Sequence, residues 1–469
     1  MPLWVLPVLW TVGLGLWGLS RRHSVWRDEA ATWQVARRST AEIWQLLGQV
    51  DAVHGLYYLL MHALFTCFGP GTTTLRLPSV LAMALAAACV TVIGQRLAGP
   101  WAGLGAGMTL GLLPAVQFYL QEGRPYALVM AGAAVSTLLL VGLLERPAPW
   151  RWAAYGGTVL LCGLLNWLSL LVLVAHAVTL CWTRARRGTW VRWAVAAAGA
   201  VSGTAPLILF SRGQSEQISW IPPLTWHMLI GPAILLAIGS LGALLDRPRP
   251  GGPSVASVGL PLLAVPLLAL TGISLIKPLF LDRYILFGQL GLALLIGTAL
   301  GRAIGAARPR SPRAARLILP LVLAAATASL LPYSLAKRSP SSRVDDVLSA
   351  ADRVHRLKHP GDAVLFIPAA RRDTALVSPD AFTGLRDIAL AEAPVASGTL
   401  KGVEADPPAI TAAIPHCARI LLVTDAPGVA KPASARRDKA KKAALRRYFT
   451  PVADETVRGR RVTVYERLP

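Results

Sequence analysis

An acidic pair, Asp28 and Glu29, stands in the segment SVWRDEAATW at 24–33, directly after the first apolar run. A carboxylate in such a place can take the proton of an acceptor hydroxyl in a glycosyl or acyl transfer, if it lies beside the leaving group. A helix cap is the structural alternative, because a predicted helix follows Asp28 and acidic side chains favour first turns. Trp26 and Trp33 flank the pair, and their amphipathic rings favour the headgroup level of a membrane. We therefore expect the carboxylates where a lipid headgroup meets water.

A second group of candidate site residues lies in DAVHGLYYLLMH at 51–62. His54, Tyr57 and Tyr58 begin the apolar stretch of this segment. Their structural alternative is a belt of amphipathic rings at the membrane interface.

The segment QEGRPYAL at 121–128 places Glu122, Arg124 and Tyr126 between two apolar runs. A plain turn would explain it if Pro125 starts the next helix and Glu122 pairs with Arg124. Charges at the edge of a membrane are usually functional, however, so we interpret this segment as part of a site.

Another charged segment is KPLFLDRYIL at 277–286, which supplies Lys277, Asp282, Arg283 and Tyr284. An arginine is well shaped to bind a phosphate oxyanion. The alternative is a solvated loop whose long side chains snorkel to water.

The elements that must position these residues are membrane helices. The chain has 469 residues, a mean hydropathy of +0.51 and only 15% charged residues, whereas a soluble domain has about a quarter. Apolar runs of about 20 residues, enough to cross about 30 Å of hydrocarbon, recur along the chain. The first lacks a basic start and a cleavage site, so we expect a retained anchor. We predict about 11 spans, with 55–68 at the surface: 3–20, 74–94, 101–119, 126–144, 152–166, 168–182, 190–210, 226–245, 256–276, 282–301 and 315–335.

The formal charge of +23 indicates topology and not nucleic-acid binding, because the basic residues lie mostly in short loops between apolar runs. Loops near 146–151, 184–192, 247–249 and 302–316 collect arginine on one side, which the positive-inside rule assigns to the cytoplasm. The opposite face then holds the loop 21–73, the segment 121–126, the loop 211–223 and the segment 277–284. The arginines of the first loop, 21–73, disagree with this orientation, because the positive-inside rule alone would place that loop in the cytoplasm.

The composition changes after Leu335. Residues 338–469 are polar and alternate an amphipathic helix, VDDVLSAADRVHRL, with short apolar strands in PGDAVLFIP and ARILLVTDAPG, a basic helix and a final strand. We predict a small soluble α/β domain with its own core, outside the cytoplasm. The five cysteines form no metal-binding or disulfide pattern.

Five motifs in the same order resemble a known family. The chain resembles the GT-C type polyprenol-phosphate-sugar-dependent glycosyltransferases, in particular the dolichyl-phosphate-mannose protein mannosyltransferase and lipid A aminoarabinose transferase superfamily (glycosyltransferase family 39-like). The motifs are WRDEAATW, HGLYYLLMH, RLPS at Arg76–Ser79, QEGRPYAL and DRYILFGQLGLALLIG. The resemblance identifies residues 1–336 as a GT-C-like transmembrane domain, with juxtamembrane helices in the loop 21–73.

The resemblance implies an inverting transfer on the extracytoplasmic face of the cell membrane. The donor would be a polyprenyl-phosphate sugar, a hexose such as mannose, and the acceptor a hydroxyl of a protein, glycan or lipid. Asp28 matches the family's catalytic acidic position and would be the general base, supported by Glu29. Arg124, Lys277 and Arg283 would hold the departing phosphate. Without a Gly-rich phosphate loop or a Cys/His metal set, we expect no nucleotide and no cofactor; some GT-C relatives use a divalent metal.

Three features depart from the family pattern. Gly55-Leu56 replaces the usual Pro-Pro after the histidine, the loop 211–223 is short, and the C-terminal α/β domain is not shared by all members. The alternatives are a polytopic lipid transporter or flippase, a non-catalytic scaffold with a sensor domain, and another membrane transferase such as an acyltransferase. A transporter or an acyltransferase would use polar residues within spans, where Asn166 and His176 are the candidates.

Overall fold

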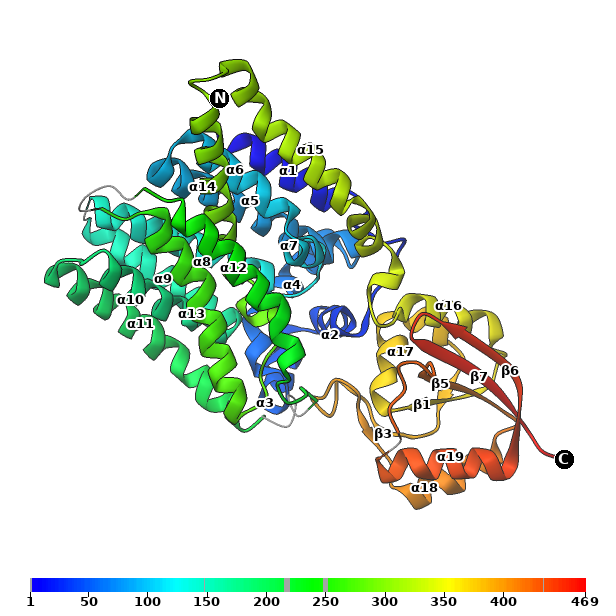
Figure 1. Cartoon of the computed structure of the whole chain (residues 1–469). Helices are drawn as coiled ribbons and strands as arrows, with labels where there is room; N and C mark the ends of the chain where they lie inside the picture. The colour runs from blue at the N-terminus through cyan, green and yellow to red at the C-terminus, as the bar shows by residue number, and fades with distance from the viewer. Residues whose placement is uncertain (1, 147, 215–219, 248–251, 433) are drawn as a thin grey trace. The chain divides into compact units, whose positions relative to one another are not determined.

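The computed structural model describes residues 2–146, 148–214, 220–247, 252–432 and 434–469 (Figure 1). The predicted loops at 211–223 and 247–249 lie partly outside these residues. The chain divides into two compact units. Unit 1 comprises Met1–Trp17, Ala52–Tyr57 and Arg76–Leu335, and unit 2 comprises Gly18–Asp51, Tyr58–Leu75 and Ala336–Pro469.

Unit 1 is a bundle of apolar helices, the form that satisfies every backbone group in lipid. Seven of the described helices are long and apolar enough to cross a membrane. Each predicted span overlaps a helix, so the mostly helical membrane fold is confirmed. The helices are α1 Val5–Leu16, α5 Thr72–Ala98, α6 Pro100–Leu112, α7 Pro114–Tyr119, α8 Tyr126–Glu145, α9 Pro149–Leu165, α10 Leu171–Trp182, α11 Arg187–Arg212, α12 Ile230–Leu244, α13 Val255–Ile276, α14 Gly288–Ala307 and α15 Pro312–Lys337, with 3-10 turns η1 Ala52–His54, η2 Trp167–Leu170, η4 Trp226–Leu229 and η5 Asp282–Ile285.

Several predicted spans differ in detail from the structure; for example, the spans 168–182 and 226–245 begin as the 3-10 turns η2 and η4. The span 101–119 is broken into α6 and α7 because Pro114 lacks an amide donor and disfavours a helical Leu113, whose φ and ψ are −57° and 131°. The span 282–301 begins as the 3-10 turn η5, and its helix α14 starts only at Gly288. Asp282, Arg283 and Tyr284 therefore lie in a turn before the helix.

Small residues let the helices of unit 1 approach closely. A Cβ atom on Gly297 of α14 would lie 2.5 Å from the carbonyl oxygen of Ala102 in α6, and one on Gly291 would overlap the carbonyl oxygen of Gly259 in α13. Such contacts between backbones are a common means of helix association in lipid. The outer helices expose apolar side chains. In an apolar 18-residue stretch of α15, only 11% is buried inside the protein.

The C-terminal part of unit 2 is a five-stranded sheet in the order β2-β1-β5-β7-β6. Strand β1 pairs in parallel with β2 and β5, while β7 is antiparallel to β5 and β6. The predicted strands and basic helix are present, and β2, β3, β4 and β6 are additional strands. The elements are η6 Pro340–Ser342, α16 Val347–Leu357, β1 Ala363–Ile367, η7 Ala369–Arg372, α17 Asp373–Val377, η8 Pro379–Phe382, β2 Arg386–Asp387, β3 Leu390–Glu392, β4 Val403–Glu404, α18 Pro407–Ala413, η9 Ile414–His416, β5 Arg419–Asp425, α19 Arg436–Tyr448, β6 Phe449–Val457 and β7 Arg460–Arg467.

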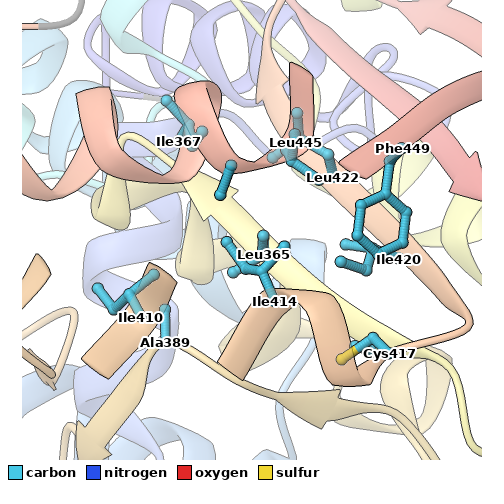
Figure 2. Packing of buried hydrophobic residues seen from close by; sticks show 12 residues of the cluster. Leu365, Ile367, Ala389, Ile410, Ile414, Cys417, Ile420, Leu422, Leu445 and Phe449 are labelled. Carbon is cyan, nitrogen blue, oxygen red and sulfur yellow. The ribbon is translucent and has the colours of Figure 1, made fainter. Parts of the chain in front are cut away.

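Helices cover both faces of this sheet, so the central strand β1, AVLFI, is apolar and buried at every position. Leu365 and Ile367 of β1 point to the face covered by α18 and α19, where they pack with Leu445 and Phe449 (Figure 2). Val364 and Phe366 point to the opposite face, which α16 and η8 cover. The period of two along each strand thus builds two cores.

Unit 2 also holds the helices that follow the first span: α2 Arg27–Ala36, α3 Thr40–Gln49 and most of α4 Gly55–Phe68. Ser39 and Glu42 form a capping box at the start of α3. Trp33 of α2 packs edge-on against Phe65 of α4, with 5.4 Å between the ring centroids. This grouping favours a surface position for 55–68, which stays a prediction.

Candidate active site

Asp28 lies in the first turn of α2, half-buried. The helix starts at Arg27 and its N-cap position is Trp26, whose backbone is extended (φ −102°, ψ 167°). Asp28 is therefore not the helix cap that the structural alternative required. A carboxylate here interacts favourably with the positive end of the helix dipole.

The partner carboxylate, Glu29, is held by a buried ion pair. Nη2 of Arg21 donates to Oε1 and Oε2 of Glu29 at 2.6 and 2.7 Å, and both side chains are fully buried. Arg21, Arg22 and His23 all have positive φ, between 46° and 60°. Three consecutive non-glycine residues in this region persist only where the surroundings enforce them. The Arg21–Glu29 pair thus ties a strained turn to the first turn of α2.

In unit 1, the loop 121–125 between α7 and α8 is held by hydrogen bonds to its neighbours. Ser79 Oγ donates to the carbonyl oxygen of Glu122 at 2.6 Å, and Nε2 of Gln121 donates to the carbonyl oxygens of Gly15 and Trp17 at 2.8 and 2.6 Å. The side chains of Glu122 and Arg124 are buried. A solvated turn would leave them in water, so this loop is built into the bundle.

Arg124 contacts His54 within unit 1. The Nη2 atom of Arg124 lies 2.8 Å from Nε2 of His54. A guanidinium has no acceptor atom, so the imidazole accepts through Nε2 and is neutral. Burial, and then the charges of Arg124 and Arg283, lower the pKa of His54 well below its usual range. A neutral histidine therefore lies beside two fixed positive charges.

Arg283 is held among aromatic rings in the same unit. Its guanidinium carbon lies 5.7 Å from the ring centroid of Tyr126, 5.4 Å from that of Trp220 and 5.8 Å from that of Tyr284. These distances fit cation–π contacts. Tyr119 continues the aromatic group, with its ring centroid 5.7 Å from that of Tyr126.

The structure thus joins two segments that were predicted separately, 121–128 and 277–286, and adds His54. Sequence reasoning missed Tyr119 and Trp220, whose only signal was an aromatic ring next to a charged segment. Tyr119 donates to Oδ1 of Asp282 at 3.3 Å, and the exposed Asp282 also accepts from the backbone amide of Arg283 at 2.8 Å.

Other predicted site residues lie apart from this group. Lys277 is exposed at the end of α13, and its side chain makes no hydrogen bond or ion pair within the described part of the chain. Tyr58 belongs to unit 2 and donates to Oδ2 of Asp51 at 2.8 Å, while Tyr57 is fully buried. Across the described ranges, no group of three or more His, Cys, Asp or Glu side chains could hold a metal ion.

The two polar candidates within the predicted spans, His176 and Asn166, have local partners. His176 Nδ1 lies 2.8 Å from the hydroxyl of Tyr155 and its Nε2 lies 3.0 Å from that of Thr137. Asn166 accepts a hydrogen bond from the amide of Leu168 at 3.1 Å and so caps the turn η2. Both therefore have structural roles within the bundle.

No family model and no curated protein matches the chain. Solved structures similar to it do exist. ArnT from Cupriavidus metallidurans in the apo state superposes with a TM-score of 0.64 at 15% identity, over 98% of this chain and 97% of that chain. ArnT bound to undecaprenyl phosphate superposes with a TM-score of 0.62 at 16% identity, over 98% and 97%. The chain has the ArnT fold.

The likeness to ArnT confirms the GT-C-like architecture that the five motifs predicted. Because the match covers 98% of the chain, it extends through the C-terminal sheet domain as well as the helical bundle. The sheet domain is therefore a part of the ArnT fold and not an unrelated addition.

Proposed function

We propose that the protein is an integral membrane glycosyltransferase that uses a polyprenyl-phosphate sugar as donor. The observation that carries this proposal is the group of Arg124, Arg283 and neutral His54 in a chain with the ArnT fold. One of the similar ArnT structures is bound to undecaprenyl phosphate, and a lipid phosphate is the kind of anion that two fixed guanidiniums bind well.

The two arginines would stabilise the phosphate as the bond between sugar and oxygen breaks. Negative charge develops on the leaving oxygen, and fixed positive groups in a water-poor site stabilise such charge strongly. The aromatic rings around Arg283 hold its guanidinium in place before the donor arrives. Lys277 would be a further, more mobile contact to the phosphate.

Asp28 would act as the general base. Its carboxylate would take the proton of the acceptor hydroxyl while the hydroxyl oxygen attacks the anomeric carbon, so that the configuration is inverted and polyprenyl phosphate leaves. Glu29, whose charge is neutralised by Arg21, would support Asp28 by holding the turn before α2.

The proposal extends to the donor sugar, the acceptor and the side of the membrane. A hexose such as mannose is the proposed sugar, and a hydroxyl of a protein, glycan or lipid is the proposed acceptor. The arginine distribution of the later loops supports an extracytoplasmic site and C-terminal domain in a multi-pass cell-membrane protein. Lipid transport is the alternative, and the local partners of His176 and Asn166 give it no support.

The test uses purified protein with a panel of polyprenyl-phosphate sugars and a membrane extract as acceptor, and measures release of polyprenyl phosphate. Loss of a general base predicts that Asp28→Asn lowers release by about a hundredfold. Asp352→Asn, which changes an exposed carboxylate on α16, is the matched control. Equal release by wild type and Asp28→Asn would remove Asp28 from the chemistry. Absence of release from every donor by folded protein would favour lipid transport.

A further inference from the structure

The carboxyl edge of the sheet in unit 2 is charged. The parallel neighbours β1 and β5 both end at this edge. Along the sheet, β2 lies on one side of β1 and β5 on the other, so the connections on either side of β1 run in opposite directions. Ligands of open α/β sheets bind at such a switch point. Here Arg371 and Asp373 follow β1, and Asp425 ends β5.

This edge is occupied by the start of α2, the helix that carries Asp28. The Nε atom of Arg27 donates to Oδ2 of Asp345 at 2.9 Å, and the backbone amide of Arg27 donates to Oδ1 at 3.0 Å. The Nη2 atom of Arg27 also lies 3.5 Å from Oδ1 of Asp425, which Arg371 holds with two hydrogen bonds of 2.6 and 2.9 Å. Arg27 thus lies where an α/β domain would bind a ligand.

A second arginine, Arg460, binds the same carboxylate oxygen of Asp345 as the Arg27 side chain. Arg460 Nε and Nη2 lie 3.0 and 2.9 Å from Oδ2 of Asp345, and Arg460 also donates to both carboxylate oxygens of Asp373 at 2.7 and 2.8 Å. Burial raises the pKa of Asp345, but the charges of Arg460 and Arg27 outweigh burial and lower it. Asp345 is therefore ionised and keeps a partner even when Arg27 is replaced.

The backbone on either side of Trp26 is held in the same way. The amide of Val347 donates to the carbonyl oxygen of Val25 at 2.7 Å, and the amide of Val25 lies 3.4 Å from Oδ1 of Asp346. Together with the hydrogen bond from the backbone amide of Arg27 to Asp345, these contacts define the position of residues 25–27. The next residue is Asp28.

We propose that Arg27 and Asp345 are positioning residues for Asp28, because their ion pair fixes the first turn of α2 on the C-terminal sheet. This proposal rests on the proposed role of Asp28 as general base. The C-terminal domain would then take part in turnover by holding the base-bearing helix, without touching the substrate.

The test compares Arg27→Gln, which removes the charge, with Arg27→Lys, which keeps the charge but not the guanidinium geometry. The Arg27 side chain is 28% exposed and Asp345 retains Arg460, so both variants should fold. Arg353→Gln is the matched control, because it removes the surface ion pair with Glu455 in the same unit. Hydrogen exchange of residues 25–33 and steady-state turnover are measured for all three.

We expect faster exchange at 25–33 in Arg27→Gln, and a kcat lowered by about tenfold or more with donor KM changed by less than about twofold, because a small misplacement of a catalytic group slows the chemical step. Arg27→Lys should recover part of kcat. The control should resemble wild type. Unchanged exchange at 25–33 in Arg27→Gln would overturn the docking contact, whatever the activity.

A double variant separates positioning from general damage. If Arg27 acts through Asp28, Arg27→Gln should lower kcat in the wild-type background and leave the residual turnover of Asp28→Asn unchanged. Equal losses in the two backgrounds would overturn the positioning role while Asp28 stays the base. If Asp28→Asn keeps full turnover, Asp28 is not the general base and the positioning role fails with it, while the transferase activity itself stands.

Discussion

The guanidinium of Arg124 donates a hydrogen bond of 2.8 Å to Nε2 of His54, across 70 positions of the chain. The contact ties the loop before α8 to the turn before α4 within unit 1. This contact itself does not neutralise the charge of the arginine, since the imidazole is neutral.

Replacement of Arg124 by Gln should lower kcat/KM for the donor by about a hundredfold, because a fixed donor to the departing phosphate is lost. Steady-state release of polyprenyl phosphate measures this change. Arg308→Gln, at an exposed position after α14, is the matched control and should resemble wild type. A donor kcat/KM within about twofold of wild type would contradict a phosphate role for Arg124.

Arg283 and Lys277 should contribute unequally, although both were predicted to bind phosphate. Arg283 is ordered by three aromatic rings, whereas Lys277 is exposed and loses side-chain entropy when it binds. We expect Arg283→Gln to lower donor kcat/KM by at least about tenfold and Lys277→Gln to have a smaller effect. The opposite order would show that the lysine is the stronger phosphate contact.

Breaking the Arg21–Glu29 pair should destabilise the protein more than removal of a surface charge. Glu29→Gln leaves the buried Arg21 charge without its carboxylate, and loss of one partner of a buried pair costs about 3–5 kcal/mol. Chemical denaturation in detergent measures the free energy of unfolding. Glu455→Gln, from a partly exposed pair, is the control and should cost about 1 kcal/mol or less.

The double replacement Arg21→Met/Glu29→Leu distinguishes a supporting role of Glu29 from a catalytic one. Apolar residues of similar volume often restore the stability that a broken buried pair loses. If Glu29 only supports the turn, the double variant should regain stability and much of its turnover. A stable double variant without turnover would indicate that the Glu29 carboxylate takes part in the reaction.

The neutral state of His54 makes stability depend on pH. The pKa of His54 in the folded protein is below the value of about 6.5 that it has when unfolded. Below pH of about 6.5 the unfolded chain therefore binds a proton that the folded protein does not, and the stability falls as the pH falls. Above this pH the contribution of His54 is constant.

Thermal unfolding at pH 7.5 and pH 5.0 tests this dependence. The melting temperature of wild type should fall by more between the two conditions than that of His54→Gln, which cannot titrate. His416→Gln, at an exposed position in η9, is the control and should follow wild type. An equal fall for wild type and His54→Gln would show that this histidine is not held neutral.

Much of the fold could be predicted from local patterns. The lengths of the apolar runs predicted the helices of unit 1, and the short apolar runs in DAVLFI and ILLVTD predicted the central strands. The break at Pro114 was not predicted, and proline alone does not signal it, because α5, α11, α13 and α15 continue through prolines. The edge strand β6 was missed, since FTPVADETV contains a proline and few apolar residues.

The sequence by itself determined the membrane bundle, the sheet domain and the residue types that can carry the chemistry, because hydrophobic length and periodicity are local properties of the chain. Only the tertiary structure decided which of these residues meet. Arg27 and Asp345 are 318 positions apart, and Tyr119 and Asp282 are 163 apart. Such contacts depend on the packing of distant segments, and the burial of Asp345 strengthens its ion pair with Arg27 because the local dielectric is low.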